Sequence, residues 1–334
     1  MDQKYFIGID ISKGKIDCAI ISSDFTLLLE KTVKNSDRNI TSFLRAIMKK
    51  LKASQQAVFV CCEHTGIYNK PLERVCLEMG IELWQEQALK IKRASTDMRG
   101  KSDSKDAMRI AEYAVRYHDR RVSHVAPSSS IQKLNGLSKA RETLLGQKTA
   151  LENQLREAKS HDPFLYDTLK TSYNTMIRTI KKQLATIDEE LESALNIDKE
   201  IKENAELVRS VPGVGKVTAL QMIIATNNFK NFKSAKHLAC YAGVVPFLNE
   251  SGTIIKKARV SKMANMKLKM LLHLSAMAAV RTETELKEYY KRMVEKGKNK
   301  MSVINAVRNK LVHRIWAVVS RKSPFLPVNN FLSN

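Results

Sequence analysis

Short apolar runs alternate with polar segments over the first 120 residues and predict a mixture of strands and helices. Strand-like runs occupy 4–10, 15–22, 26–32, 57–62 and 81–85. Apolar residues at helical spacing occupy 38–52, 68–79 and 104–118, and Gly80 follows the second of these segments as a natural C-cap. Because only short links join the first three strands, we expect an antiparallel meander. The resulting order, βββαβαβα, is that of the ribonuclease H and RuvC fold.

Residues 131–160 and 165–205 are long, polar and helix-prone, with a break at His161-Asp162-Pro163. In the second segment, apolar side chains repeat every seven residues in two lines offset by four: Tyr173, Ile180, Ile187 and Ala194, and Ile177, Leu184 and Leu191. This pattern is the seam of a coiled coil, so we expect an antiparallel helical hairpin. A protruding hairpin is suited to dimerisation, although a coil that packs only within its own chain would show the same seam.

The pattern therefore predicts an α/β part followed by an all-α part, arranged in three domains. We expect a RuvC-like, ribonuclease-H-like domain over 1–125, a coiled-coil helical hairpin over 126–205, and a helical domain over 206–334. A chain of 334 residues is long enough for two domains and a spacer.

The charge of the chain indicates a polyanionic partner. It contains 57 Lys and Arg against 34 Asp and Glu, a formal net charge of +23. Residues 256–314 hold 16 basic and 4 acidic side chains, so about half of the excess lies in this one segment. Such a concentration favours a phosphate-binding surface over an ordinary solvated helix face. Nucleic acid is the polyanion that fits best.

Other features of the composition argue against a membrane or secreted protein. No uncharged apolar run is long enough to span a bilayer, and the start, Met1-Asp2-Gln3-Lys4, does not resemble a signal peptide. The five cysteines show neither CxxC pairs nor zinc spacing, and Cys61 and Cys62 lie inside an apolar strand. We expect buried, reduced thiols and a cytoplasmic protein.

Four acidic residues lie where this fold would place a metal-dependent nuclease site. Asp10 and Glu63 each end an apolar strand, and Asp103 and Asp106 are three apart at the start of a helix, so they share one face of it. Each could alone be a surface or turn residue, and Asp103 could be only a helix N-cap. Together, their oxygen atoms suit hard divalent cations, which polarise phosphodiesters. We expect them to bind Mg²⁺, with Mn²⁺ as a substitute.

A glycine-rich turn, Val211-Pro212-Gly213-Val214-Gly215-Lys216, lies between two apolar helices. It resembles a helix-hairpin-helix turn, in which glycines let the backbone present N–H groups to a DNA phosphate. We expect Gly213, Gly215 and Lys216 to contact nucleic acid. The alternative is an ordinary tight turn between helices.

Ser251 lies in the polar segment Pro246–Thr253, which reads as a loop, and a Ser-Gly pair there is ordinarily part of a turn. A serine hydroxyl can nevertheless attack a phosphate that metal ions polarise. Basic residues that could contact the neighbouring backbone follow it, namely Lys256, Lys257, Arg259 and Lys262.

In this order, the motifs of the chain resemble those of the "IS one-ten" group of insertion-sequence transposases, the DEDD recombinases guided by a bridge RNA. The matching motifs are Ile7-Gly8-Ile9-Asp10, Glu63-His64-Thr65-Gly66, Lys101-Ser102-Asp103-Ser104-Lys105-Asp106-Ala107, Val211-Pro212-Gly213-Val214-Gly215, Tyr241-Ala242-Gly243-Val244-Val245-Pro246, Ser251-Gly252 and Arg259-Val260-Ser261-Lys262. Some relatives carry a second serine before the Ser-Gly pair, where this chain has Glu250.

The resemblance implies a role for each of these residues. Asp10, Glu63, Asp103 and Asp106 would be the Mg²⁺-binding quartet, and Ser251 would form a covalent phosphoserine link to DNA. The protein would work as a homotetramer, in which the coiled coil assembles homodimers. The RuvC-like domain of one subunit would complete a composite site with the serine domain of another. A non-coding guide RNA would pair with double-stranded donor and target DNA. Such a protein would be bacterial and nucleoid-associated.

Two other functions fit the sequence. One is a RuvC-like, structure-selective endonuclease in which water is the nucleophile and Ser251 is a turn residue. The other is a non-catalytic nucleic-acid-binding protein in which the acidic cluster has lost its function. A site-specific recombinase or transposase accounts for more of the motifs than either alternative.

Overall fold

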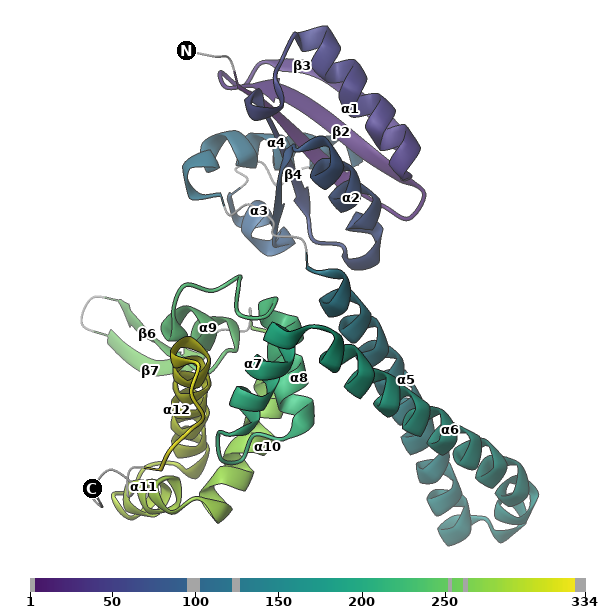
Figure 1. Cartoon of the computed structure of the whole chain (residues 1–334), viewed down its shortest axis with the longest axis vertical. Helices are drawn as coiled ribbons and strands as arrows, with labels where there is room; N and C mark the ends of the chain where they lie inside the picture. Colours follow the sequence, from purple (N-terminus) through teal and green to yellow (C-terminus); the bar gives the residue numbers. More distant parts are fainter. Residues whose placement is uncertain (1–3, 95–102, 122–126, 252–253, 261–263, 328–334) are drawn as a thin grey trace. The chain divides into compact units, whose positions relative to one another are not determined.

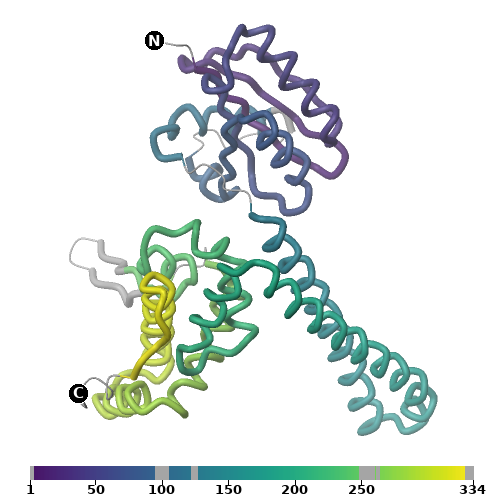
Figure 2. Tube along the Cα trace, in the orientation of Figure 1, coloured from purple at the N-terminus to yellow at the C-terminus, as the bar shows by residue number. Residues whose placement is uncertain are grey.

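The computed structural model of the chain describes residues 4–94, 103–121, 127–251, 254–260 and 264–327. The chain divides into an N-terminal unit, Met1–Ala126, and a C-terminal unit, Pro127–Asn334 (Figure 2). No helix in the described ranges combines the length and the apolar character that a membrane span requires.

Five strands form a mixed sheet in the N-terminal unit (Figure 1). They are β1 (Tyr5–Ile11), β2 (Lys15–Ser22), β3 (Leu27–Lys34), β4 (Val58–Glu63) and β5 (Glu82–Glu86), in the spatial order β3-β2-β1-β4-β5. The pairs β1–β2 and β2–β3 are antiparallel, whereas β4 runs parallel to β1, and β5 to β4. The predicted meander and the ribonuclease H and RuvC fold are therefore confirmed.

The helices of this unit are α1 (Asp37–Leu51), α2 (Lys70–Met79), α3 (Ala88–Ala94) and α4 (Asp103–Arg116). Gly80 ends α2 in the left-handed conformation, at φ 63°, as predicted for a C-cap. The strands and the helices α1, α2 and α4 begin and end within two residues of the predicted ranges. The helix α3 was not predicted, because its seven residues bury only Ile91 and so show no helical periodicity.

The alternation of side chains along β1 separates two layers of helices. Ile7 and Ile9 belong to an aliphatic core that includes side chains of α1 and α2. Phe6 belongs to a second core, which includes Trp84 and side chains of α3 and α4. Because side chains of a strand point to opposite faces in turn, Gly8 and Asp10 lie on the same face as Phe6, which is the face that α4 covers.

Two long helices, α5 (Ser129–His161) and α6 (Pro163–Ile197), form the predicted antiparallel hairpin of the C-terminal unit (Figure 1). The side chain of Asp162 accepts a hydrogen bond from the backbone N–H of Leu165 and so caps α6 after the break. The predicted seam is buried at Ile177, Leu184 and Leu191. The hairpin is therefore held by its own apolar stripe.

The second arm ends earlier than predicted. We expected one helix over 165–205, but α6 ends at Ile197 and α7 (Lys199–Arg209) begins after Asp198. The side chain of Asp198 accepts a hydrogen bond from the backbone N–H of Ile201 at 3.2 Å, which makes it the N-cap of a new helix. The line of Ile177, Leu184 and Leu191 meets the polar Asp198 at its next position, so the two-line seam is interrupted where α6 ends.

The remaining helices of the C-terminal unit are α8 (Lys216–Thr226), α9 (Ala235–Tyr241), α10 (Met266–Thr282), α11 (Thr284–Glu295) and α12 (Lys300–Arg321). They share one apolar core, in which α12 contributes a nearly continuous buried stripe. Ile131 and Leu134 at the start of α5 join the same core, so the hairpin is anchored in this helical part.

A two-stranded antiparallel ribbon, β6 (Pro246–Ser251) and β7 (Ile254–Val260), interrupts the helices between α9 and α10. We had expected a loop around Ser251 within an all-helical region. Turn-forming residues at the centre of the ribbon obscured the strands, although the β-branched pair Ile254-Ile255 is typical of a strand.

Candidate functional site

Asp10 and Glu63 lie side by side at the carboxyl ends of two parallel strands. In the register of β1 and β4, Ile9 is opposite Cys62, so the next residue of each strand is one of the two carboxylates. Both side chains are half-buried. The strand pairing therefore brings together two acidic residues that are 53 positions apart in the sequence.

Close packing of α4 on β1 brings a third carboxylate to this edge of the sheet. A Cβ atom placed on Gly8 would lie 2.2 Å from the backbone nitrogen of Ala111 and 2.3 Å from the carbonyl oxygen of Ala107. Only glycine allows this approach, and it fixes the height of α4 above the strand. Asp106, next to Ala107 in the first turns of α4, is thereby placed near Asp10.

The pKa of Glu63 is raised by its surroundings. Burial raises it above its usual value, and the negative charges of Asp10 and Asp106 raise it further. Arg109, one turn further along α4, forms an ion pair between its Nη1 atom and Oδ1 of Asp106 at 2.8 Å. The site thus contains mutually repelling carboxylates, of which Asp106 has a cationic partner.

Asp103 begins α4, one turn before Asp106, but its side chain lies outside the described part of the structure. Among the side chains that are described, no three acidic, His or Cys residues form a group that could hold a metal ion. Asp10 and Asp106 are thus close enough to Glu63 for their charges to raise its pKa. Asp103, the fourth predicted ligand, lies on the same helix as Asp106.

Glu86 is an acidic residue at this edge that we did not predict. It ends β5 directly opposite Glu63. Its carboxylate accepts a hydrogen bond from Tyr113 Oη at 3.3 Å and pairs with Lys90 Nζ at 3.0 Å. Burial raises the pKa of Tyr113, and the charge of Glu86 adds to the effect. The sequence pattern that indicates Glu63 also indicates Glu86, because both residues end an apolar strand.

Ser251 is the last residue of β6 and faces Ile254 of β7 across the ribbon. The side chains of 248–259 lie outside the described part of the structure, as does the whole of Lys262. The backbone places Lys256 opposite Asn249, and Arg259 opposite Phe247. Ser251 therefore lies at the tip of the ribbon, and Lys256, Lys257 and Arg259 lie along its second strand.

The turn at 211–216 joins α7 to α8, as predicted. Gly213 has φ +83°, and a Cβ atom there would lie 2.4 Å from the carbonyl oxygen of Ser275 in α10. The glycine is thus required by packing inside the unit. Gly215 is the N-cap residue of α8 and has open space around it, and it makes no side-chain cap. Lys216 pairs with Glu192 Oε1 at 2.6 Å.

Comparisons with known proteins agree with this geometry. A family model described as "Transposase", of the DEDD type of IS110, matches residues 7–158, and the model "Transposase IS116/IS110/IS902 family" matches residues 205–291. The pilin gene-inverting protein of Moraxella bovis is 26% identical over 326 residues, covering 96% of this chain and 98% of the relative.

The transposase for insertion sequence element IS1111A of Coxiella burnetii is 27% identical over 257 residues, covering 67% of this chain and 68% of the relative. Among solved structures, Thermus thermophilus RuvC in complex with a Holliday junction substrate is 13% identical, with a TM-score of 0.28. The match covers 36% of this chain and 99% of RuvC. The two family models and these relatives lead to one conclusion: the chain belongs to the IS110 family of insertion-sequence transposases.

Proposed function

We propose that the protein is a site-specific DNA recombinase of an insertion sequence, which cuts and rejoins DNA through a covalent link to Ser251. The observation that carries this proposal is the electrostatic unit of Asp10, Glu63 and Asp106 on the RuvC-like sheet. Acidic side chains gathered at one sheet edge repel one another and are stabilised by positive charge nearby. Because the chain has a net charge of +23 and would repel a cationic protein, a cationic cofactor is the better source of that charge.

Asp10, Glu63, Asp103 and Asp106 are the residues that would hold Mg²⁺, since repelling carboxylates are a suitable donor set for a hard divalent cation. The bound metal would polarise the phosphodiester and stabilise the charge that develops on it. For Asp106 to bind the metal, Arg109 must then give up its ion pair with Asp106 or share the carboxylate with the metal. In the meantime, the ion pair between Arg109 and Asp106 holds the carboxylate in a fixed orientation.

The role of Ser251 in this reaction is nucleophilic. Its Oγ atom forms a bond to phosphorus, the bond from phosphorus to one sugar oxygen breaks, and the serine proton is lost while the leaving oxygen gains one. The phosphorus remains a diester, so the energy of the broken bond is retained. A sugar hydroxyl of another strand can then reverse the attack and release the serine.

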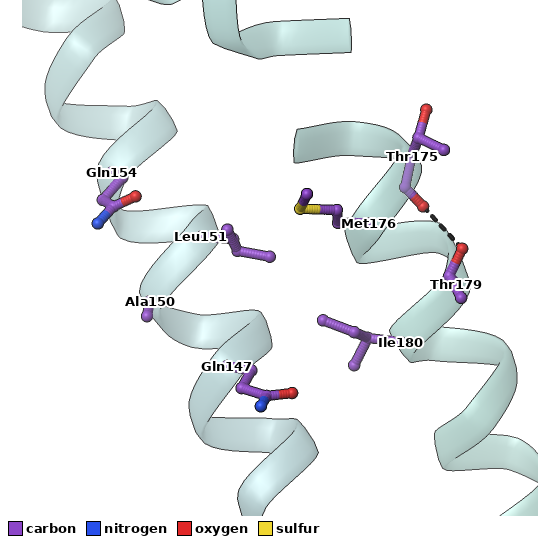
Figure 3. A pocket seen from close by; sticks show the side chains of 8 residues that line it. All are labelled: Gln147, Ala150, Leu151, Gln154, Thr175, Met176, Thr179 and Ile180. Atoms are coloured by element: carbon purple, nitrogen blue, oxygen red, sulfur yellow. Dashed lines mark hydrogen bonds between the residues drawn. The ribbon is translucent and has the colours of Figure 1, made fainter. Parts of the chain in front are cut away.

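A second copy of the chain fits this proposal, because the hairpin presents an apolar gap. Between α5 and α6, in the half nearest their connecting turn, a gap of about 520 Å³ is lined by Gln147, Ala150, Leu151, Gln154, Thr175, Met176, Thr179 and Ile180 (Figure 3). Leu151, Met176 and Ile180 point into it from the two helices. Another helix with an apolar stripe would fill such a gap, and we propose that the same hairpin of a second subunit does so.

The guide RNA and the double-stranded donor and target DNA belong to the same proposal. Their support is the family membership together with the basic segment 256–314. The segment carries enough positive charge to follow several phosphates of a nucleic-acid backbone.

Ser251→Ala tests the proposal against its alternatives. The full chain is incubated with DNA that carries the element ends, the non-coding RNA of the element and Mg²⁺, and the products are separated under denaturing conditions. We expect wild type to give a protein–DNA adduct that withstands denaturation, and Ser251→Ala to give none. Ser302→Ala, which alters an exposed serine of α12, serves as the control and should behave as wild type.

The alternatives give different results in the same assay. A nuclease that uses water would still cleave DNA after Ser251→Ala, and this outcome would refute the nucleophile assignment. A binding protein would show no metal-dependent cleavage even as wild type, and this outcome would refute the enzymatic function as a whole.

A further inference from the structure

Arg308 is a charged residue within the buried stripe of α12. Its side chain is only 7% exposed, and Ile304, Val307, Leu311 and Val312 on the adjoining turns are buried in the core. The pattern of this helix predicts an apolar side chain at position 308. A guanidinium held there loses most of its hydration, and burial lowers its pKa below the usual range.

No carboxylate of the described residues lies within ion-pair distance of Arg308, and its Nε atom has no hydrogen-bond acceptor among them. Arg314, on the same helix, shows the usual arrangement, with Glu285 Oε2 at 2.6 Å and Glu283 Oε2 at 3.6 Å. A buried cation without a counter-charge lowers stability and is unusual in a folded protein. Such a group calls for a functional explanation.

A second basic group lies close to Arg308. His273 of α10 is close enough that the charge of Arg308 adds to burial in lowering its pKa, and its Nδ1 atom has no hydrogen-bond partner among the described residues. Lys269 lies one turn before His273 on the same helix face, and its Cδ atom would be 3.4 Å from a Cβ atom on Gly243. His273 and Arg308 therefore form a basic pair between α10 and α12, and Lys269 lies one turn away from it on α10.

This basic pair lies near the foot of the ribbon that carries Ser251. Asn305, one turn before Arg308 on the same face of α12, donates a hydrogen bond from Nδ2 to the carbonyl oxygen of Val244 at 2.8 Å. Val244 is two residues before the start of β6, whose other end is Ser251. An extended strand rises about 3.3 Å per residue, so the length of β6 separates the foot from the tip by roughly 17 Å.

We propose that Arg308 and His273 bind one backbone phosphodiester of nucleic acid, several nucleotides away from the phosphate that Ser251 attacks. The inference rests on the proposed function in its choice of nucleic acid as the ligand. A planar guanidinium matches the phosphate oxygens with two parallel N–H donors, and a histidine ring adds one more. The bound strand would thereby be fixed at the foot of the ribbon and held in register with Ser251 at its tip.

The charge of the surroundings favours a phosphate over a carboxylate of another protein. Residues 256–314 contain 16 basic and 4 acidic side chains, which repel a basic second copy and attract a polyanion. If an acidic protein segment occupies this position instead, Arg308→Met and its control will bind nucleic acid equally well.

Binding of labelled nucleic acid by Arg308→Met is the first experiment. Duplex DNA of 30 random base pairs and RNA of the same length are titrated with the full chain over a range of salt. Loss of a charged hydrogen bond should weaken binding about ten- to hundred-fold. Loss of one phosphate contact should lower the slope of log K against log salt by about 0.9 on duplex DNA. An effect on only one of the two probes identifies which nucleic acid binds Arg308 and His273.

Arg281→Met is the matched control. It removes the same charge from an exposed position on α10, so it measures the general loss of attraction. If the two variants bind nucleic acid equally well, Arg308 contacts no phosphate and the proposal is overturned. If wild type itself fails to bind nucleic acid, the proposed function fails, and the next experiment decides whether Arg308 binds phosphate at all.

Thermal unfolding without nucleic acid is the second experiment. Because Arg308 is buried and no described residue supplies a counter-charge, Arg308→Met should raise the unfolding midpoint. Inorganic phosphate, compared with chloride at equal ionic strength, should raise the midpoint of wild type but not that of Arg308→Met. A lower midpoint for Arg308→Met, or an equal response of both proteins to phosphate, would show that the arginine is part of the fold and would refute the proposal.

Discussion

Gly8→Ala tests how the candidate metal centre is positioned, because this glycine carries no chemistry of its own. The added Cβ atom would lie 2.2 Å from the backbone nitrogen of Ala111 and 2.3 Å from the carbonyl oxygen of Ala107. Favourable contacts between heavy atoms begin near 3.5 Å, so α4 must move away from β1 by roughly 1 Å or more. No side-chain rotation can relieve the overlap, since both atoms belong to the backbone.

The cost of this movement exceeds the usual benefit of alanine. Replacing glycine inside a strand is ordinarily favourable by about 0.5–1 kcal/mol, whereas overpacking costs about 1–3 kcal/mol. The net loss should therefore be about 1–2 kcal/mol, or roughly 5–10 °C in the unfolding midpoint of a unit of this size. Asp103 and Asp106 move with α4. A misplacement of about 1 Å at a reacting centre costs about 10²-fold in rate.

The two effects can be measured separately. Trp84 lies in the core between α4 and the sheet, so in a Trp316→Phe background its fluorescence reports unfolding of the N-terminal unit alone. Adduct formation on DNA at a temperature well below the midpoint measures activity. The control is Gly14→Ala, because nothing lies within 4 Å of a Cβ atom at that position. Wild-type stability together with wild-type activity in Gly8→Ala would refute the close packing of α4 on β1.

Three further predictions address other parts of the chain. The raised pKa of Glu63 means that the folded protein holds this proton more tightly than the unfolded chain does. Glu63→Gln should therefore raise the thermal midpoint in EDTA at neutral pH, and it should abolish DNA cleavage when Mg²⁺ is present. The gain should shrink as the pH falls through the raised pKa and vanish below 4.5, the usual value; a gain that is independent of pH would contradict the assignment. Met176→Glu places a charge in the apolar gap of the hairpin and should reduce the mass measured by light scattering, whereas Asn174→Glu on another face of α6 should not. Asp198→Ala removes the N-cap of α7 and should cost about 1 kcal/mol in denaturant unfolding, and no loss would mean that the cap contributes nothing.

The sequence alone determined the features that depend on local pattern. Short apolar runs located β1 and β4, and the acidic residue near the end of each strand was visible without a structure. The seven-residue repeat through Ile177 and Leu184 was enough to identify the hairpin, because a helix must bury such a stripe against a partner. Composition and motif order were enough to indicate a DNA-processing enzyme.

Only the tertiary structure decided the features that depend on contacts between distant segments. It showed that Gly213 is required by packing against α10, that Arg109 pairs with Asp106, and that Glu86 lies beside Glu63. It also revealed Arg308 as a buried cation without a carboxylate partner among the described residues. The physical reason is that burial and pairing are properties of a residue's surroundings in space, which are set by helices and strands far away along the chain.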